Sequence, residues 1–180
     1  MRFDHYRVLT EMTEESKEYA PTGPPEAVNQ LIQGQAQAET PAHALRVLLV
    51  EDNQDHQRLM LLMLQRLGVY VVVAQNGQDG FEAVLRGEPA QLILMDLHMP
   101  RFDGYGATEQ IRLVDKKNCH ARRAIVAVTA YTDPDERERC LAVGMDDVLL
   151  KPVSFEKLKS VLAQWLPRDK HADINLASSF

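Results

Sequence analysis

Five short apolar runs, the first beginning at residue 47, constrain the fold of this 180-residue chain more than any other feature of its sequence. Each run is apolar at nearly every position, as expected for a strand that is buried on both faces of a sheet. Helix-length segments with apolar residues at helical spacing separate the runs. This alternation predicts an α/β fold, in which helices cover both sides of one parallel sheet and the crossovers are right-handed. The predicted strands are VLLV (47–50), VYVVV (69–73), LILM (92–95), IVAV (125–128) and VLL (148–150), and the predicted helices span 53–67, 77–86, 105–114, 134–143 and 154–165.

Polar residues follow the predicted strands at the points where these strands end. Glu51 and Asp52 follow the first strand, Asp96 the third, Thr129 the fourth and Lys151 the fifth. The carboxyl ends of parallel strands meet at one edge of the sheet, and ligands of open α/β sheets bind beyond that edge. The sequence therefore predicts a site where three carboxylates, a hydroxyl and an ammonium group converge.

The chemistry of these groups favours a magnesium site that handles phosphate. Clustered carboxylates repel one another, and a hard divalent cation bound through oxygen relieves the repulsion. Mg²⁺ takes one or two protein carboxylates, keeps several waters and can use its remaining positions for phosphate. Asp96 could then act as a nucleophile that forms an acyl phosphate. Lys151 would neutralise charge on the phosphoryl oxygens, and the Thr129 hydroxyl would hydrogen-bond one of them.

Residues 45–167 resemble the receiver domain of two-component response regulators. Four segments carry the resemblance: VLLVEDN, LILMDLHMPRFDG, the VTA at 128–130, and GMDDVLLKP at 144–152. The resemblance implies a flavodoxin-like, doubly wound parallel sheet of five strands in the order 2-1-3-4-5 with five helices. It also implies a phosphoryl group accepted from a histidine kinase or a histidine phosphotransfer protein. The protein would be a switch or relay, and not an enzyme that turns over an external substrate.

The resemblance assigns a role to each residue of the predicted site. Asp96 would be the phosphoacceptor, Thr129 the switch hydroxyl and Lys151 the phosphate-binding cation. Mg²⁺ would be held by Asp52, Asp96 and the backbone carbonyl of His98, with Glu51 contacting it through water. The side chain of His98, like that of Tyr131, would lie at the rim of the site.

Two further features concern docking and readout. The helix predicted at 53–67 is apolar around much of its circumference, and in receiver domains this helix commonly meets the histidine-bearing helices of the phosphodonor. Receivers usually carry Phe or Tyr three residues before the lysine, but this chain carries Val148 there. The aromatic half of the usual switch is therefore missing, and we expect readout through another surface or a role as a relay.

The ends of the chain and its overall charge suggest a cytosolic protein with no direct contact to membranes or nucleic acids. Residues 1–44 are Pro- and Gln-rich and read as a linker, with two short helices as the alternative, and residues 168–180 read as a flexible tail. The net charge of -6 disfavours nucleic-acid binding, and no apolar run approaches the length of a membrane span. Cys119 and Cys140 lack a CxxC spacing and read as free thiols in a reducing compartment.

Several alternatives remain open at this level. The chain could be a receiver module related to hybrid sensor kinases or a free-standing receiver whose downstream target is another protein. It could also be a pseudo-receiver that binds partners without phosphorylation. A phosphatase of the haloacid dehalogenase type would need a second acid two residues after the nucleophile, where this chain has His98. The basic run at 116–123 is either a solvated loop or a docking site for an acidic partner.

Overall fold

The structure is a computed structural model that describes residues 45–117, 122–130 and 133–166. Within these residues the chain forms five strands, which lie in a single sheet in the order β2-β1-β3-β4-β5. Every pair of neighbouring strands is parallel. The predicted fold class and strand order are therefore confirmed. The strands are β1 (Arg46–Val50), β2 (Tyr70–Ala74), β3 (Leu92–Asp96), β4 (Ala124–Thr129) and β5 (Asp147–Leu150).

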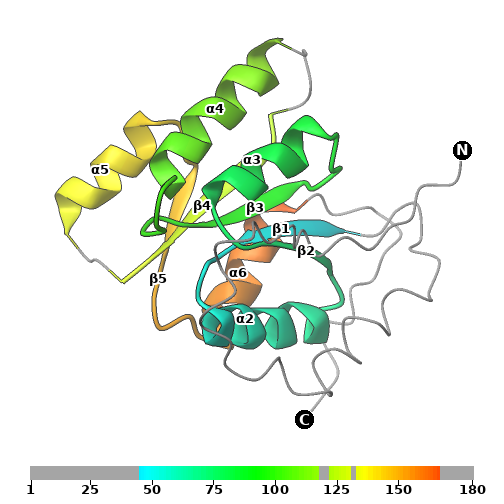
Figure 1. The fold of residues 1–180 in the computed structure, drawn as a ribbon. Coiled ribbons are helices and arrows are strands. Elements are labelled where there is room, and N and C mark those ends of the chain that lie inside the picture. The colour runs from blue at the N-terminus through cyan, green and yellow to red at the C-terminus, as the bar shows by residue number, and fades with distance from the viewer. Residues whose placement is uncertain (1–44, 118–121, 131–132, 167–180) are drawn as a thin grey trace, which may run out of the picture. The chain divides into compact units, whose positions relative to one another are not determined.

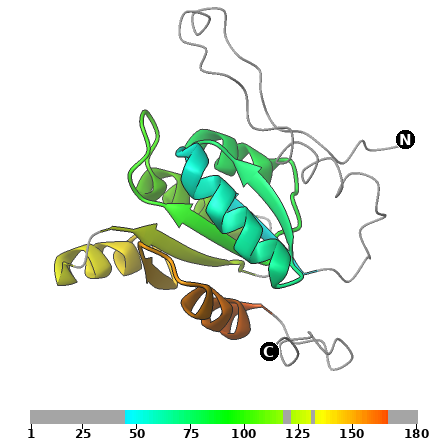
Figure 2. The same ribbon diagram turned by 90° about the horizontal axis from the view of Figure 1, so that it is seen from below.

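Helices cover the sheet on both sides, as Figures 1 and 2 show, with α2 and α6 on one side and α3, α4 and α5 on the other. Side chains define several helix starts, because they accept hydrogen bonds from backbone amides of the first turn. Asn53 caps α2, Asn76 caps α3, and Ser154 caps α6 as predicted. The helices in the described part of the chain are α2 (Gln54–Arg66), α3 (Gly77–Leu85), α4 (Gly104–Lys117), α5 (Pro134–Ala142) and α6 (Phe155–Trp165).

The central strands lie at the heart of the core. All five residues of β3 and all six of β4 are buried, whereas the edge strands β2 and β5 are buried only in part. Continuous apolar runs suit strands that have no solvent-facing side. The register pairs Val50 with Met95 and Thr129 with Leu150, so that the strands end at nearly the same level. This alignment brings the polar residues after each strand to one edge.

Some strand boundaries differ from the sequence-based expectations. β3 includes Asp96 and β4 includes Thr129, because ladder pairing continues for one residue beyond each apolar run. On α2, which the sequence predicts to be apolar around much of its circumference, Leu59 and Leu62 are each about half exposed. A helix that is apolar on most sides does not reveal from its sequence which side meets the sheet.

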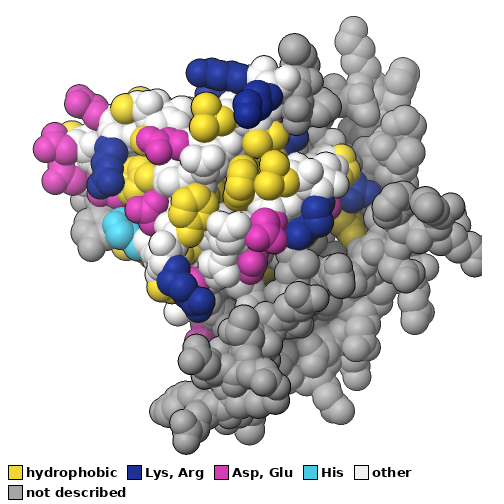
Figure 3. Space-filling model, turned by 45° about the horizontal axis from the view of Figure 1, so that its top comes forward, with side chains coloured by type: hydrophobic (Ala, Val, Ile, Leu, Met, Phe, Trp, Pro, Cys, Tyr) yellow, Lys and Arg dark blue, Asp and Glu magenta, His cyan; other side chains and the backbone are white. Residues whose placement is uncertain are grey.

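Other predictions concern surface and compartment. The face in Figure 3 mixes Lys and Arg with Asp and Glu, so the described residues visible there form no uniformly basic surface. In the described ranges, no helix has both the length and the hydropathy needed to span a membrane. Cys140 is a free and buried thiol. The predictions for residues 1–44, for the tail at 168–180, for Cys119 and Tyr131, and for positions 118–121 of the basic run lie outside the described residues.

Candidate phosphoacceptor and metal site

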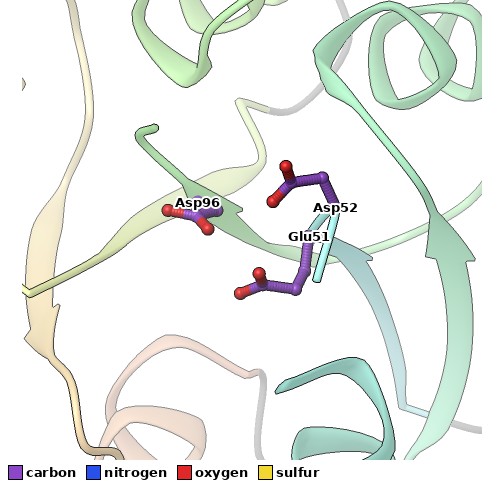
Figure 4. A group of neighbouring side chains, drawn as sticks. All are labelled: Glu51, Asp52 and Asp96. Atoms are coloured by element: carbon purple, nitrogen blue, oxygen red, sulfur yellow. The ribbon is translucent and has the colours of Figure 1, made fainter. Parts of the chain in front are cut away.

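Three carboxylates meet at the carboxyl edge of the sheet, as Figure 4 shows. Glu51 and Asp52 directly follow β1, and Asp96 is the last residue of the neighbouring strand β3. Each of the three offers a ligand oxygen, and these oxygens lie within 4.8 Å of one another. Glu51 and Asp96 are buried, whereas Asp52 is exposed. The carboxylates predicted from the strand ends are thus brought together, with one of them open to water.

Lys151 reaches into this group from the end of β5. Its Nζ donates a hydrogen bond to Asp96 Oδ2 at 2.7 Å and another to Glu51 Oε2 at 2.8 Å. The Lys151–Pro152 peptide bond is cis, and the Lys151 amide donates to the Thr129 carbonyl at 2.7 Å. Burial alone would lower the pKa of Lys151, but its hydrogen bonds to Asp96 and Glu51 outweigh burial and raise the pKa. The ammonium group is therefore charged at neutral pH.

The electrostatic environment of Glu51 reflects an excess of negative charge. Burial raises the pKa of Glu51, and the neighbouring Asp96 carboxylate raises it further, while Lys151 acts in the opposite direction. One ammonium group faces three carboxylates, so the described site has a net negative charge when all four groups are ionised. Oxygen donors with excess negative charge are what a hard divalent cation requires, and the residues present therefore fit Mg²⁺.

The loop after Asp96 packs closely against the acceptor. The backbone amide of His98 donates to Asp96 Oδ1 at 3.2 Å. A Cβ atom on Gly104 would lie 2.2 Å from the Asp96 carbonyl oxygen, so only glycine fits where α4 begins. Arg101, which lies between His98 and Gly104 in the sequence, has a positive φ of 69°, which is uncommon for a residue with a side chain. The sequence MPRFDG thus forms a tight turn that holds the acceptor's backbone.

Thr129 and Val148 are the residues for which the receiver resemblance predicts a switch hydroxyl and a missing aromatic ring. Thr129 ends β4 and is 1% exposed. Val148 lies on β5 opposite Ala127 and packs, partly buried, against the core. The structure therefore places a short aliphatic side chain where receivers usually have an aromatic ring.

The sequence-based reasoning missed a polar link between the start of α4 and α5, which also approaches His98 in the loop after Asp96. The Tyr105 hydroxyl donates to Glu136 Oε1 at 2.6 Å, and the Arg139 guanidinium lies 4.1 Å from the centre of the Tyr105 ring. Burial raises the pKa of Tyr105, and the hydrogen bond to Glu136 raises it further. Glu136 Oε1 also lies 3.9 Å from His98 Nε2. No local sequence signal joins positions 31 residues apart, so this contact depended on the fold.

The reasoning also missed His56, which lies in the first turn of α2. Its Nδ1 atom is 3.4 Å from Lys151 Nζ and 3.4 Å from Glu51 Oε1. The available signal was the short spacing: His56 comes six residues after the end of β1, in the first turn of the next helix, and a side chain at such a position can turn back over the end of the strand. His98 drew attention instead because it is close to Asp96 in sequence.

Comparison with known proteins agrees with this geometry. The family model described as "Response regulator receiver domain" matches residues 47–163. The sensor protein GacS of Pseudomonas syringae is 38% identical over 124 residues, which cover 69% of this chain and 14% of GacS. The osmosensing histidine protein kinase SLN1 of Saccharomyces cerevisiae is 34% identical over 127 residues, covering 68% of this chain and 10% of SLN1. The chain thus spans a small part of these relatives.

Two solved structures are similar in fold and sequence. The receiver domain of the sensor histidine kinase PA1611 from Pseudomonas aeruginosa has a TM-score of 0.61 and 35% identity, covering 68% of this chain and 97% of that one. That domain was crystallised with a magnesium ion coordinated in its active-site cleft. A chain in the co-crystal of the Saccharomyces cerevisiae phosphotransfer protein Ypd1 with the receiver domain of Ssk1 has a TM-score of 0.64 and 31% identity, covering 68% and 88%.

Proposed function

Because the chain belongs to the response regulator receiver domain family, we propose that it accepts a phosphoryl group on Asp96 from a phosphohistidine donor, in the presence of Mg²⁺. The observation that carries the proposal is the position of Asp96, whose carboxylate lies 2.7 Å from Lys151 Nζ beside Glu51 and Asp52. A nucleophile, a fixed cation and a place for a metal are the components that phosphoryl transfer needs.

The chain's own residues have distinct tasks in this reaction. A carboxylate oxygen of Asp96 attacks phosphorus and forms the new P–O bond, while the P–N bond breaks and its electron pair returns to the donor imidazole. Lys151 shifts from the Asp96 carboxylate to a phosphoryl oxygen, and the Thr129 hydroxyl donates to another. Asp52, Asp96 and the His98 carbonyl would hold Mg²⁺, with Glu51 contacting it through water. When bound, the ion supplies positive charge opposite the transferring group.

The donor in this proposal is a histidine kinase or a histidine phosphotransfer protein that docks on α2. The half-exposed Leu59 and Leu62 support this surface, because apolar side chains in contact with water favour burial against a partner. The Ypd1–Ssk1 complex is one in which a receiver domain meets a phosphotransfer protein. The relatives support a module of the kind found in hybrid sensor kinases.

The remaining parts of the proposal concern organisation and output. We assign residues 45–167 to the receiver, 1–44 to a linker and 168–180 to a tail. The protein acts as a switch or relay through contacts with a downstream protein, and it has no turnover of an external substrate. The free Cys140 thiol supports a cytoplasmic location, where thiols stay reduced.

A labelling experiment tests this function. The full chain is incubated with phosphoramidate, with and without Mg²⁺, and the covalent phosphoryl group is detected by intact mass. We expect labelling that depends on Mg²⁺, is lost in Asp96→Asn and persists in the control Asp55→Asn, whose carboxylate is 88% exposed on α2.

Each other outcome has a defined meaning. Labelling that persists in Asp96→Asn would move the acceptor to another residue. Absence of labelling in the unsubstituted protein would favour a pseudo-receiver that acts as a binding module. Steady turnover of an external phosphoester would favour a phosphatase.

A further inference from the structure

His56 lies beside the candidate site, although it does not belong to any of the strand ends that form this site. Its side chain is half exposed, and its Nδ1 atom lies 3.4 Å from Lys151 Nζ. This contact links residues 95 positions apart in the chain.

Local structure at the start of α2 determines where the imidazole points. Asn53 caps the helix by accepting hydrogen bonds from the amides of Asp55 and His56, both at 3.0 Å. The side chain of Gln57 donates to the Glu51 carbonyl. These bonds orient the first turn directly over the end of β1. The residue at position 56 is therefore directed back toward Glu51 and Lys151 by backbone geometry and not by its own flexibility.

The donor count of Lys151 explains what His56 can do there. An ammonium group has three N–H bonds and no acceptor. Two of them point to Asp96 Oδ2 and Glu51 Oε2. His56 Nδ1 lies within reach of the third. Glu51 Oε1, also 3.4 Å from Nδ1, accepts from the Asn53 amide at 3.2 Å and could accept from Nδ1 as well if that atom carried the ring proton. Because the ammonium group has no acceptor of its own, a hydrogen bond with Lys151 requires the tautomer with the proton on Nε2, in which Nδ1 is the acceptor.

We propose that His56 is a positioning residue for phosphoryl transfer, because its Nδ1 lone pair holds the Lys151 ammonium group at the mouth of the cleft while that group moves from Asp96 to the incoming phosphoryl group. This inference rests on the proposed function. During the transfer Lys151 gives up its bond to Asp96, and contacts with Glu51 and His56 keep it in place. Without His56, the third N–H would turn to water and the ammonium group would sample more positions, which slows a reaction that depends on alignment.

Two substitutions of nearly equal shape distinguish the loss of a hydrogen-bond acceptor from a change in side-chain size. Asparagine places its Oδ1 acceptor at the position of the histidine Nδ1, whereas leucine places a methyl group there. The experiment measures the rate of phosphorylation of the full chain by phosphoramidate at saturating Mg²⁺, in the unsubstituted protein, His56→Asn and His56→Leu. Thermal midpoints and Mg²⁺ titrations of the three proteins accompany the rates, because His56 is not one of the proposed metal ligands.

We expect His56→Leu to be slower by about three- to tenfold, the effect of losing one hydrogen bond of ordinary strength. His56→Asn should restore the rate to within about twofold of the original, because its acceptor occupies the same place. Mg²⁺ affinity should be equal in all three proteins.

The possible contrary results are distinct. Equal rates in all three proteins, with Asp96 labelled, would overturn the role of His56 and leave the proposed function intact. Equal slowing in both variants would also overturn it, because ring size and not the acceptor would then matter. A loss of Mg²⁺ affinity that accounts for the slowing would assign the effect to Glu51 instead. If the unsubstituted protein is not labelled, the proposed function and this inference both fail.

Discussion

The structure contains two clusters of buried charge at opposite edges of one sheet, and their charge balance is different. The candidate site lies at the carboxyl ends of the strands. The second cluster, which we call the Arg112 cluster, lies near the amino ends of β4 and β5. Its largely buried members are Arg112, Arg123, Asp115 and Asp146, two cations and two anions, and the half-exposed Arg122 pairs with Asp146 at its rim. Both clusters join side chains that are distant in sequence, but only the candidate site has an excess of negative charge among its members.

The Arg112 cluster pairs most of its charged groups with one another, although Asp115 Oδ1 and Arg123 Nη1 are buried without a hydrogen-bond partner in the described part of the chain. The Arg112 guanidinium donates to Asp146 Oδ2 at 2.8 Å, to Asp115 Oδ2 at 3.2 Å, and to the carbonyl oxygens of Gly144 and Arg123, both at 2.8 Å. Asp146 also accepts from the Ile125 amide at 2.8 Å and pairs with Arg122. Burial lowers the pKa of Arg112, and the nearby Arg122 lowers it further, while both aspartates act in the opposite direction. Cation and anion therefore satisfy each other here without a metal.

The comparison teaches that buried charge is not by itself a sign of function. In the Arg112 cluster, hydrogen bonds and ion pairs among the arginines and the two aspartates join α4, β4 and the start of β5. At the site, three carboxylates lie near one ammonium group, and a bound cation would balance the excess negative charge. A buried charge that is well paired contributes to the architecture, and an unbalanced group of charges marks a place for a ligand.

The largest effect on stability should come from breaking the balanced cluster. Arg112→Gln leaves Asp115 and Asp146 without their shared buried cation, and we expect the free energy of unfolding to fall by about 3 kcal/mol. Urea denaturation measures this loss. The matched control Arg122→Gln removes a half-exposed partner of the same Asp146 and should cost about 1 kcal/mol or less. Equal losses of stability in the two variants would show that the burial of a guanidinium group does not determine how much it contributes to the free energy of unfolding.

Removing an acid from the unbalanced cluster should change metal binding instead of weakening the fold. Asp52→Ala deletes a proposed direct ligand, and we expect the Mg²⁺ dissociation constant to rise by about tenfold or more. A titration followed by amide resonances measures this affinity. Asp55→Ala, an exposed acid three positions later, serves as the control and should leave the titration unchanged. An unaltered affinity in Asp52→Ala would contradict the proposed coordination.

The sign of the stability change should reverse between the two clusters. In the absence of Mg²⁺, Glu51→Gln relieves a buried and repelled carboxylate, and we expect the free energy of unfolding at neutral pH to rise by about 1 kcal/mol. Because the folded state raises the pKa of Glu51, ionised Glu51 destabilises the fold above that pKa. The gain should therefore be full above the pKa of Glu51 in the folded state, decline as the pH falls through that pKa, and be absent below the ordinary value of 4.5. A loss of stability at pH 7 in Glu51→Gln would mean that the ion pair between Glu51 and Lys151 stabilises the fold by more than burial and repulsion destabilise it.

The smallest effect concerns communication between the clusters, which share β5. With Val148 in place of an aromatic ring, β5 has no aromatic side chain that could follow a movement of Thr129. We expect a beryllium fluoride complex to shift amide resonances strongly near Asp96, Thr129 and Lys151 but only modestly along α5. Val148→Tyr should enlarge the response of α5 if the ring is accommodated. Equally large shifts in the unsubstituted protein would assign the signal to another path, for which Tyr105 and Glu136 are the candidates.

The sequence allowed the strand order and the residues at the strand ends to be predicted, because both follow from apolar runs and from a recognisable set of motifs. It did not allow the contacts of His56, because the direction of a side chain on α2 depends on the angle at which the helix leaves β1. The Arg112 cluster could not be predicted from the sequence either, since the spacing of Arg112 and Asp115 suggests only an ordinary ion pair within one helix. Asp146 joins them through the fold, which no local pattern encodes.

The fit of Gly104 against the Asp96 carbonyl restricts the backbone at the proposed acceptor. Because α4 begins in contact with the peptide oxygen of Asp96, a displacement of the end of β3 toward α4 would require α4 to move as well. If Asp96 is the phosphoacceptor, we therefore expect its side chain to adjust by rotation, while the donor closes most of the distance between the two partners. On that proposal, the depth to which the donor's histidine can be inserted would contribute to partner choice alongside surface complementarity.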